Sequence, residues 1–418
     1  MSPKTAPRRR GGLDRRQWLA SIAYGAVPLA SAFAAKANAL SRIKITGFTI
    51  HKVSVRWRDL VFLEVHTDAG VTGLGEATLE GRSELTEAAL RWLEESMVGR
   101  DPSGPEQHWN RNYYLLSRWR NGPAAMSALS AVDIALWDIE GKRLGVPVYR
   151  LLGGPLEHDL RVYYTHWGAS LESDRTPARF AAWAKETRPK GWTAVKWTIA
   201  SRNSEAERIA QTVAELEAIR GACGNTMDLM LEAAETFSVR SAIAFANAVA
   251  PFQPLWIEEP TLRESPSGLG DVAAKSPVPI ASGEGLFSRF EFRELLEQKG
   301  AAIVQPDVIH AGGITEIRKI ANLAETFGTE IAPHQCSGMI GHLASLHAMS
   351  VCRNFLIEEW EGADDELYLE MTNGKYPTQK NGRVALPEAP GLGISVNFAE
   401  FERKCPYRGI RGKPLVKM

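Results

Sequence analysis

The sequence of 418 residues contains few cysteines and, beyond residue 40, no long apolar run. Its cysteines are scattered and include no CxxC pair, which argues against a disulfide scaffold and against a zinc-ribbon site. No segment beyond residue 40 approaches about 18 uninterrupted apolar residues, so we expect no membrane span in that part of the chain. Low-complexity segments are also missing from this part of the sequence, which argues against a disordered or fibrous protein.

Charge is unevenly distributed, although 49 basic and 49 acidic residues cancel in total. Residues 1–39 contain seven basic residues and one acidic residue, which leaves 42 basic and 48 acidic residues in the remainder. That remainder is acidic and shows no basic stripe, so we expect no nucleic-acid binding. Apolar residues make up 44% and charged residues 23%, which is typical of a globular protein. The length predicts several domains or one large barrel with an accessory domain.

Residues 1–39 have the pattern of an export signal. The run DRRQWL at residues 14–19 resembles a twin-arginine signal, and an apolar stretch and an A-x-A cleavage pattern at residues 37–39 follow it. Gly25 and Pro28 interrupt the apolar stretch, so it makes a poor membrane span. The alternative is a basic arm followed by a core helix. The order of the three regions favours the signal, and we expect a periplasmic or secreted protein.

The next segment, residues 40–155, predicts a compact α+β domain. Apolar and polar residues alternate over residues 48–55 and 60–77, and the turn at 68–70 predicts a hairpin of antiparallel strands. Helical periodicity follows over residues 84–97 and 124–144, and the second of these ends at a glycine.

Residues 156–370 predict a barrel of parallel strands, because short apolar strands alternate with amphipathic helices such as 204–220 and 313–327. The expected strands are RVYYTHW, TAVKWTI, MDLMLEA, LWIEEP, VPIASGE, AAIVQPD, TEIAPHQ and FLIEEW. Eight strands are enough to close a (β/α) barrel. Residues 371–418 are turn-rich, and we expect them to return to the N-terminal domain. The predicted fold class is therefore α/β, a barrel with an N-terminal α+β domain.

Polar residues at the carboxyl ends of these strands indicate a catalytic centre, because the loops of such barrels converge there. The strand-end residues are His166, Lys196, Glu232, Glu258, Glu284, Asp307, His334 and Glu359. Three glutamates among them are spaced 26 residues apart, one βα unit each. Three carboxylates pointing at one volume repel unless a cation neutralises them, and oxygen ligands without His or Cys favour Mg²⁺. We expect Glu232, Glu258 and Glu284 to be metal ligands rather than solvated loop carboxylates.

Asp307 and His334 are expected to form a general base, since a carboxylate that binds an imidazole fixes its tautomer and raises its basicity. The alternative for His334 is a structural histidine. Lys196 ends the second strand and is either part of the site or a surface lysine. Glu359 is either part of the site or a carboxylate at the start of a helix.

Several longer motifs resemble the mandelate racemase subgroup of the enolase superfamily, and most closely its galactonate dehydratase-type sugar-acid dehydratases. The resemblance covers essentially the whole chain after residue 40. It is carried by FLEVHTDAGVTGLGEATLEGR, SALSAVDIALWDIEGKRLGVPVYRLLGG, WIEEP, ASGEGLFSRFEF, QPDVIHAGGITEIRKIA and APH.

The resemblance implies an enzyme with a modified TIM barrel and an N-terminal capping domain, using one Mg²⁺ to abstract the proton α to a carboxylate. Glu258 and Glu284 would take the second and third metal positions, and Lys196 with the metal would hold the substrate carboxylate. Asp307 and His334 would be the base, and Glu359 would lie beside that carboxylate. A small-molecule sugar acid is the expected partner, and we also expect a homo-oligomer.

This sequence departs from the family at three positions. Glu232 replaces the usual Asp at the first metal position, Ala234 replaces an acid/base His, and Thr198 replaces the second Lys of a K-x-K motif. With one obvious base, a dehydratase is favoured over a two-base racemase. His334 would take the proton and, in a syn elimination, return it to the leaving hydroxide. His166 and Glu235 are the other candidate acids, unless they only hydrogen-bond the substrate.

Substrate specificity is expected from loops of the capping domain. Trp57, Arg58 and Arg120 are the candidates, because Arg binds carboxylates in bidentate fashion and Trp stacks on sugar faces. Each could equally belong to a helix surface or to the core. The sequence thus predicts a Mg²⁺-dependent sugar-acid dehydratase that gives a 2-keto-3-deoxy acid. A racemase, epimerase or cycloisomerase is the alternative, and a binding protein that has lost catalysis is a third.

Overall fold

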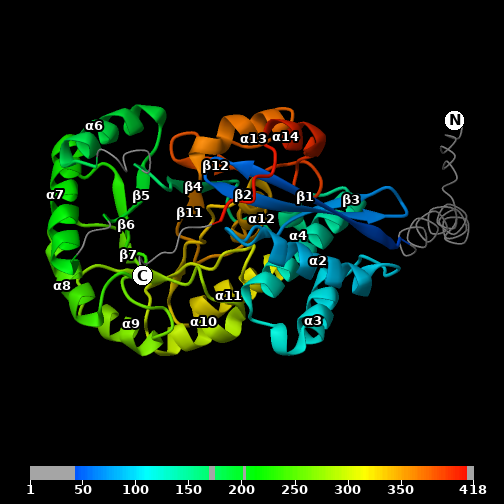
Figure 1. The fold of residues 1–418 in the computed structure, drawn as a ribbon, viewed down its shortest axis with the longest axis horizontal. Helices are drawn as coiled ribbons and strands as arrows, with labels where there is room; N and C mark the ends of the chain where they lie inside the picture. Colours follow the sequence, from blue (N-terminus) through cyan, green and yellow to red (C-terminus); the bar gives the residue numbers. More distant parts are fainter. Residues whose placement is uncertain (1–42, 169–174, 201–203, 412–418) are drawn as a thin grey trace, which may run out of the picture.

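A computed structural model describes residues 43–168, 175–200 and 204–411 (Figure 1). The expected export signal at residues 1–39 lies outside the described residues. Within the described ranges, no helix has both the length and the apolar character needed to cross a membrane. The described chain consists of a three-stranded sheet with its helices at one end, followed by a larger unit of alternating strands and helices.

The N-terminal unit is the predicted α+β domain. Its antiparallel sheet has the order β1-β2-β3, and the hairpin turn is at the expected DAG, where Gly70 has a φ of +73°. Helix α4 packs so closely on β3 that a Cβ at Gly75 would lie 2.1 Å from the carbonyl oxygen of Ala131. Its elements are β1 (Ile45–Val55), β2 (Arg58–Thr67), β3 (Thr72–Glu76), α2 (Ser83–Met97), α3 (Pro105–Leu115) and α4 (Pro123–Leu144).

The second unit is the predicted barrel. Eight parallel strands follow one another in the order β10-β9-β8-β7-β6-β5-β4-β11, and a bridge between Ile331 and Phe355 joins β10 to the segment that precedes β11. All eight expected strands are present, and each is short. They are β4 (Asp159–Tyr164), β5 (Ala194–Thr198), β6 (Asp228–Glu232), β7 (Trp256–Glu258), β8 (Ile280–Ser282), β9 (Ile303–Val304), β10 (Glu330–Ile331) and β11 (Glu358–Trp360).

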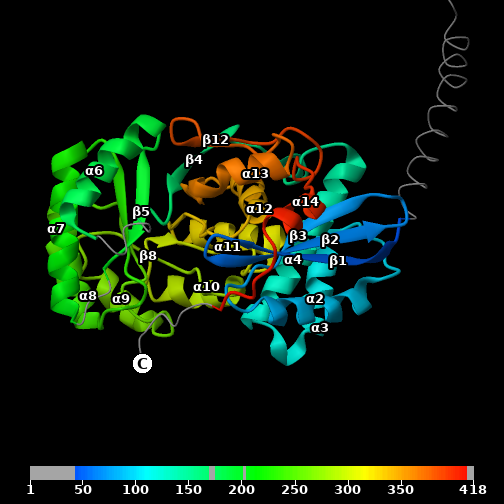
Figure 2. The same ribbon diagram turned by 45° about the horizontal axis from the view of Figure 1, so that its top comes forward.

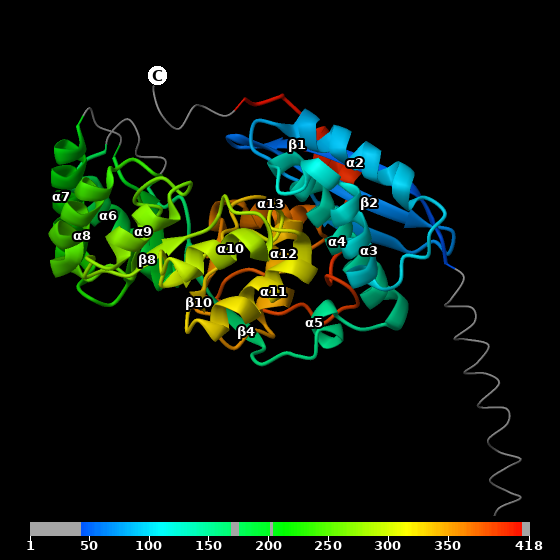
Figure 3. The same ribbon diagram turned by 90° about the horizontal axis from the view of Figure 1, so that it is seen from below.

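Helices surround this barrel, and Figure 3 shows α7 and α8 at the opposite end of the molecule from β1 and β2. The first of them begins with a capping box, in which Ser204 and Glu207 each bind the other's backbone N–H. The barrel helices are α6 (Pro177–Thr187), α7 (Glu205–Cys223), α8 (Val239–Val249), α9 (Pro266–Ala273), α10 (Ser288–Glu297), α11 (Gly313–Thr326) and α12 (Met339–Met349). A short helix, α5 (Val148–Leu151), links the two units.

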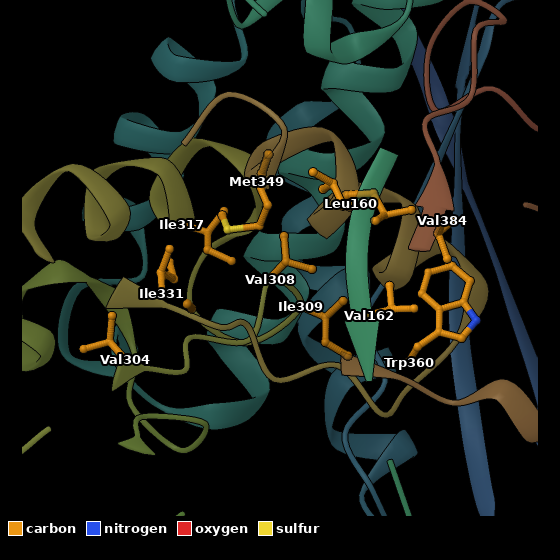
Figure 4. Packing of buried hydrophobic residues seen from close by; sticks show 14 of the residues in the cluster. Leu160, Val162, Val304, Val308, Ile309, Ile317, Ile331, Met349, Trp360 and Val384 are labelled. Carbon is orange, nitrogen blue, oxygen red and sulfur yellow. The ribbon is translucent and has the colours of Figure 1, made fainter. Parts of the chain in front are cut away.

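The core of the barrel lies in two layers. Between strands and helices, apolar side chains such as Val304, Ile317 and Met349 are fully buried (Figure 4). Inside the barrel, one side chain from each strand region meets the others: Tyr163, Ala194, Met230, Trp256, Ala281, Ile303, Ala332 and Ile357. This inner layer fills the barrel interior below the carboxyl ends of the strands, so any ligand must enter at those ends.

The chain after residue 370 contacts the N-terminal unit, to which the sequence predicted a return, and also the barrel. Strand β12 (Arg383–Ala385) pairs with β4 of the barrel, and α14 (Phe398–Lys404) packs on β1 (Figure 2). Helix α13 (Asp365–Met371) directly precedes this segment and contacts α14. Turn-rich sequence carries no register signal, which is why the pairing with β4 was not foreseen.

Buried carboxylates of the N-terminal unit join it to the barrel. Glu76, at the end of β3, accepts hydrogen bonds from the N–H groups of Gly338 and Gly341 at the start of α12, at 2.7 and 2.9 Å. Asp133 on α4 accepts bonds from the N–H and hydroxyl of Thr315 in the first turn of α11. A carboxylate at a helix N-terminus satisfies N–H groups that have no partner within the helix.

The Glu76 contact predicts a pH-dependent stability. Burial raises the pKa of Glu76 to about 7, well above its usual 4.5, even though its hydrogen bonds oppose the shift. A raised acid pKa adds stability that is complete below pH 4.5 and is lost as the pH rises through 7. The loss amounts to about 3 kcal/mol in the free energy of unfolding. Urea unfolding at pH 5 and pH 8 should show this loss in the wild type and a smaller one in Glu76→Gln. Equal pH dependence in both proteins would contradict the assignment.

Candidate active site

The carboxyl ends of the barrel strands surround a cavity of about 900 Å³. Of the residues predicted for the site, those that line it are Trp57, His166, Lys196, Glu232, Glu235, Glu284, His334 and Glu359. Glu258 and Asp307 do not reach the cavity surface, because each is fully buried behind residues that do.

Glu232, Glu258 and Glu284 converge as predicted, with one carboxylate oxygen from each lying within 4.8 Å of the others. Two of these glutamates end β6 and β7, and the third lies two residues beyond β8. Burial and the neighbouring carboxylates raise the pKa of Glu232 well above its usual value, and burial also raises that of Glu284. Protons are retained here because three like charges in one buried volume repel. A cation would relieve the same repulsion, so this donor set fits a divalent metal.

Lys196 is buried, not a surface lysine. Its ammonium group contacts the carboxylate of Glu258 and lies 3.0 Å from Oε1 of Glu359. Burial alone would lower the pKa of Lys196, but these carboxylates raise it well above its ordinary value. Its Nζ also lies 5.5 Å from the centre of the Tyr163 ring in the inner layer. The core therefore supports a lysine that stays charged at the base of the cavity.

Asp307 and His334 form the predicted pair. Nδ1 of His334 lies 2.8 Å from Oδ2 of Asp307, and its Nε2 points the other way, 3.5 Å from Oε2 of Glu284. Asp307 is held in turn by the N–H of Ile309 at 2.7 Å. Burial alone would lower the pKa of His334, but surrounding acidic groups, Glu284 first among them, raise it well above its ordinary value. The imidazole thus presents one nitrogen to the cavity and anchors the other.

Glu359 lies within β11 and does not begin a helix. Its carboxylate accepts hydrogen bonds from the hydroxyl of Thr165 and, at 2.8 Å, from the N–H of Gln335. Burial would raise the pKa of Glu359, but Lys196 and His334 lower it far below its usual value. This carboxylate is therefore ionised and sits between the lysine and the imidazole.

Two predicted substrate contacts are wrong in this structure. Arg58 is buried, and its Nη2 binds Asp364 at 2.8 Å and the carbonyl oxygen of Ser337 at 2.6 Å. Its guanidinium group is therefore paired inside the protein and does not face a substrate. Arg120 is exposed and lies over the rings of Tyr113 and Tyr114, outside the cavity lining. Trp57 does line the cavity, from the turn between β1 and β2.

Among the cavity residues that were not foreseen are His310, Cys336 and Arg263. His310 lies three residues beyond Asp307, in the same QPDVIHAGG run, and its Nδ1 is 2.9 Å from the hydroxyl of Ser127. Cys336 follows His334 by two residues. Arg263 pairs with Glu235 at 3.2 Å. The position of His310 and Cys336 beside motif residues was the available signal, whereas nothing in the sequence marked Arg263.

Comparison with known proteins decides the family. Residues 179–400 match the family model described as enolase C-terminal domain-like. Residues 37–153 match the N-terminal domain model of mandelate racemase and muconate lactonizing enzyme. A D-galactonate dehydratase from Ralstonia nicotianae is 38% identical over 377 residues, 87% of this chain and 96% of the relative. The chain belongs to the enolase superfamily.

Other relatives agree with this membership. A D-galactonate dehydratase from Pectobacterium atrosepticum is 36% identical and covers 85% of this chain and 92% of its own. The solved mandelate racemase/muconate lactonizing enzyme from a Jannaschia species is 33% identical, with a TM-score of 0.80 over 87% of this chain and 97% of its own. Membership makes the protein an enzyme of this superfamily and implies a divalent metal, and the three glutamates are the group that fits one.

Proposed function

We propose that this enolase-superfamily protein is a Mg²⁺-dependent dehydratase that converts a sugar acid into its 2-keto-3-deoxy acid. The observation that carries the proposal is the placement of Nε2 of His334 at the cavity that Lys196, Glu232 and Glu284 line, with the buried Glu258 completing the cluster of three glutamates. A base at that position faces a region built to hold a carboxylate. Relatives named D-galactonate dehydratase, which match most of the chain, support dehydration of a sugar acid in particular.

Glu232, Glu258 and Glu284 would hold the metal, and their oxygen donors suit Mg²⁺. When bound, Mg²⁺ would supply positive charge against the negative charge that develops on the substrate carboxylate. Glu232 stands where the family has Asp, yet its carboxylate reaches the other two in this structure. The longer side chain is therefore compatible with the site.

The remaining chemistry belongs to residues of this chain. Nε2 of His334 would remove the proton on the carbon next to the substrate carboxylate, with Asp307 holding Nδ1–H and so fixing the tautomer. The ammonium of Lys196 would bind the carboxylate and stabilise the enediolate, since it is buried and charged. Glu359 orients Lys196 and separates it from the imidazole. The enediolate then expels the hydroxide from the next carbon.

A substrate screen tests this function. The protein without residues 1–39 is incubated with Mg²⁺ and a library of sugar acids in D₂O, and 2-keto-3-deoxy acids are detected as they form. We expect one or a few acids to lose water, and no turnover in the presence of EDTA. Deuterium incorporation with no loss of water would instead indicate an epimerase or racemase. Binding of acids with neither reaction would contradict any catalytic function.

We further propose that residues 1–39 direct export by the twin-arginine route, because the DRRQWL run is followed by an apolar stretch and an A-x-A cleavage pattern. Changing both Arg15 and Arg16 to Lys should move the protein from the periplasmic or secreted fraction to the cytoplasm, because the route requires the arginine pair. Immunoblots of the two fractions measure this, with the variant Lys4→Arg as the matched control. An unchanged distribution would contradict the proposal. The homo-oligomeric state stays a prediction.

A further inference from the structure

A second imidazole–carboxylate pair borders the cavity, beside the one formed by His334. Nδ1 of His166 lies 2.7 Å from Oε2 of Glu361. His166 follows β4, and Glu361 follows β11, the strand that pairs with β4. His166 lines the cavity and its side chain is 28% exposed, whereas Glu361 is fully buried. With Nδ1 engaged, Nε2 is the nitrogen that can meet a ligand.

Glu361 is held as an anion by several cationic groups. Nη1 of Arg56 lies 2.8 Å from its other oxygen, Oε1. Burial alone would raise the pKa of Glu361, but the hydrogen bond from His166 and the charges of Arg58 and Arg56 lower it below its usual value. With the carboxylate bonded to Nδ1–H, a proton on Nε2 can pass to a ligand while the ring stays anchored.

The backbone and neighbours of His166 fix where its ring lies. Its φ of +48° is in the left-handed region, which residues other than glycine adopt uncommonly. On one side, Thr165 hydrogen-bonds Glu359, and on the other the N–H of Trp167 binds the carbonyl oxygen of Lys196 at 3.0 Å. The ring of Trp57 packs edge-on against the imidazole, with centroids 5.1 Å apart. The imidazole is thereby set beside the lysine and carboxylate that would bind the substrate.

Several other cavity groups are less suited to donate a proton. The side chain of Ala234 has no proton to donate. Both the N–H and the guanidinium of Arg263 bind Glu235. Burial lowers the pKa of His310, which keeps that imidazole neutral, and its Nδ1 is engaged by Ser127. Glu359 is ionised by Lys196 and His334.

We propose that His166 is the general acid that protonates the departing hydroxyl group, a role that rests on the proposed dehydratase function. His334 takes the proton from C2, the electron pair of that C–H bond passes into the enediolate, and it then forms the C2–C3 double bond. The C3–O bond breaks, and its electron pair takes the Nε2 proton of His166 to give water. The enol then tautomerises to the 2-keto-3-deoxy acid, and exchange with solvent restores both imidazoles.

Glu361 and Arg56 are positioning residues in this scheme. Arg56 belongs to the turn between β1 and β2 of the N-terminal unit, while Glu361 and His166 belong to the barrel. The orientation of the acid would therefore depend on contacts from both units. The same turn carries Trp57, which packs against the acid.

The variant His166→Asn separates this role from that of the base. We expect it to keep exchanging the C2 proton in D₂O while dehydration falls by about 100-fold or more, the usual loss of a general acid. A 3-deoxy-3-fluoro analogue should restore elimination in this variant to within a few-fold of the wild type, because fluoride leaves without a proton. His158→Asn, an exposed histidine before β4, is the matched control and should behave as wild type.

The possible outcomes are distinct. Dehydration of the natural substrate at the wild-type rate by His166→Asn, or parallel loss of exchange and dehydration, would overturn the role of His166. So would failure of the fluoro analogue to restore elimination. Absence of dehydration by the wild type with every sugar acid tested would instead overturn the dehydratase function. Glu361→Gln adds a readout that a purely structural role would not move. It should lower the rate of dehydration and leave the rate of C2 exchange in place, whereas a purely structural change would lower both together.

Discussion

Replacing His334 with Asn is expected to abolish exchange of the substrate's C2 proton and to lower dehydration by about 10²- to 10⁴-fold, the usual contribution of a general base. The asparagine amide can still donate a hydrogen bond to Asp307, so the buried carboxylate keeps a partner. What is lost is the only group at that position able to accept a proton from carbon. Exchange is followed by NMR of recovered substrate in D₂O.

Affinity for Mg²⁺ is the internal control for this variant. Nε2 of His334 lies 3.5 Å from Glu284 but offers no ligand atom to the cluster of three glutamates, so calorimetry should give a dissociation constant within a few-fold of the wild type. If the variant continues to exchange the C2 proton, His334 is not the base. If exchange and metal binding disappear together, the histidine acts by supporting the metal site.

Glu258→Gln is expected to have the second large effect, a loss of Mg²⁺ affinity that exceeds about 100-fold. Mutating even a group that only supports a metal ligand typically costs 10- to 100-fold in affinity. Glu258 is fully buried and also meets Lys196, the indole N–H of Trp256 at 2.9 Å and the amide of Gln305 at 2.6 Å. An amide in its place removes a negative charge from both the metal and the lysine.

Glu358→Gln provides a matched comparison, because it makes the same change in a buried glutamate on another strand of the barrel. Burial raises the pKa of Glu358 well above its usual value, so the wild-type group is already neutral, and it binds the hydroxyl of Ser345 instead of lining the cavity. Calorimetry and dehydration rates should be unchanged in this variant. If Glu258→Gln binds Mg²⁺ as tightly as Glu358→Gln does, the metal is held elsewhere.

The metal-ligand candidates could be predicted from sequence because barrel geometry converts spacing into position. Glu232, Glu258 and Glu284 recur at the interval of one βα unit. Strands that repeat at this interval have their carboxyl ends at the same face of a barrel. The Asp307 and His334 pair followed from the same rule, although both lie three residues beyond their short strands. Contacts between side chains at the ends of successive strands can be predicted from the sequence, because they depend only on the order of the strands.

Contacts that depend on side-chain direction could not be predicted in this way. Arg58 faces inward because it is a β2 residue with Asp364 beneath it, and nothing in the local sequence specifies which face of that strand meets the barrel. Glu361 lies one residue past β11, and its partners come from two other parts of the chain, the turn at Arg56 and the end of β4. Such partners become evident only once distant segments are placed together.

The buried carboxylates at the junction of the two units have a consequence for how the protein unfolds. Glu76 and Asp133 satisfy backbone N–H groups that begin α12 and α11. Detaching the N-terminal unit would expose the starts of two barrel helices at once, so neither unit has a low-energy route to open alone. The molecule should therefore lose its structure in a single cooperative transition, with the slowest-exchanging amides of both units sharing one opening free energy.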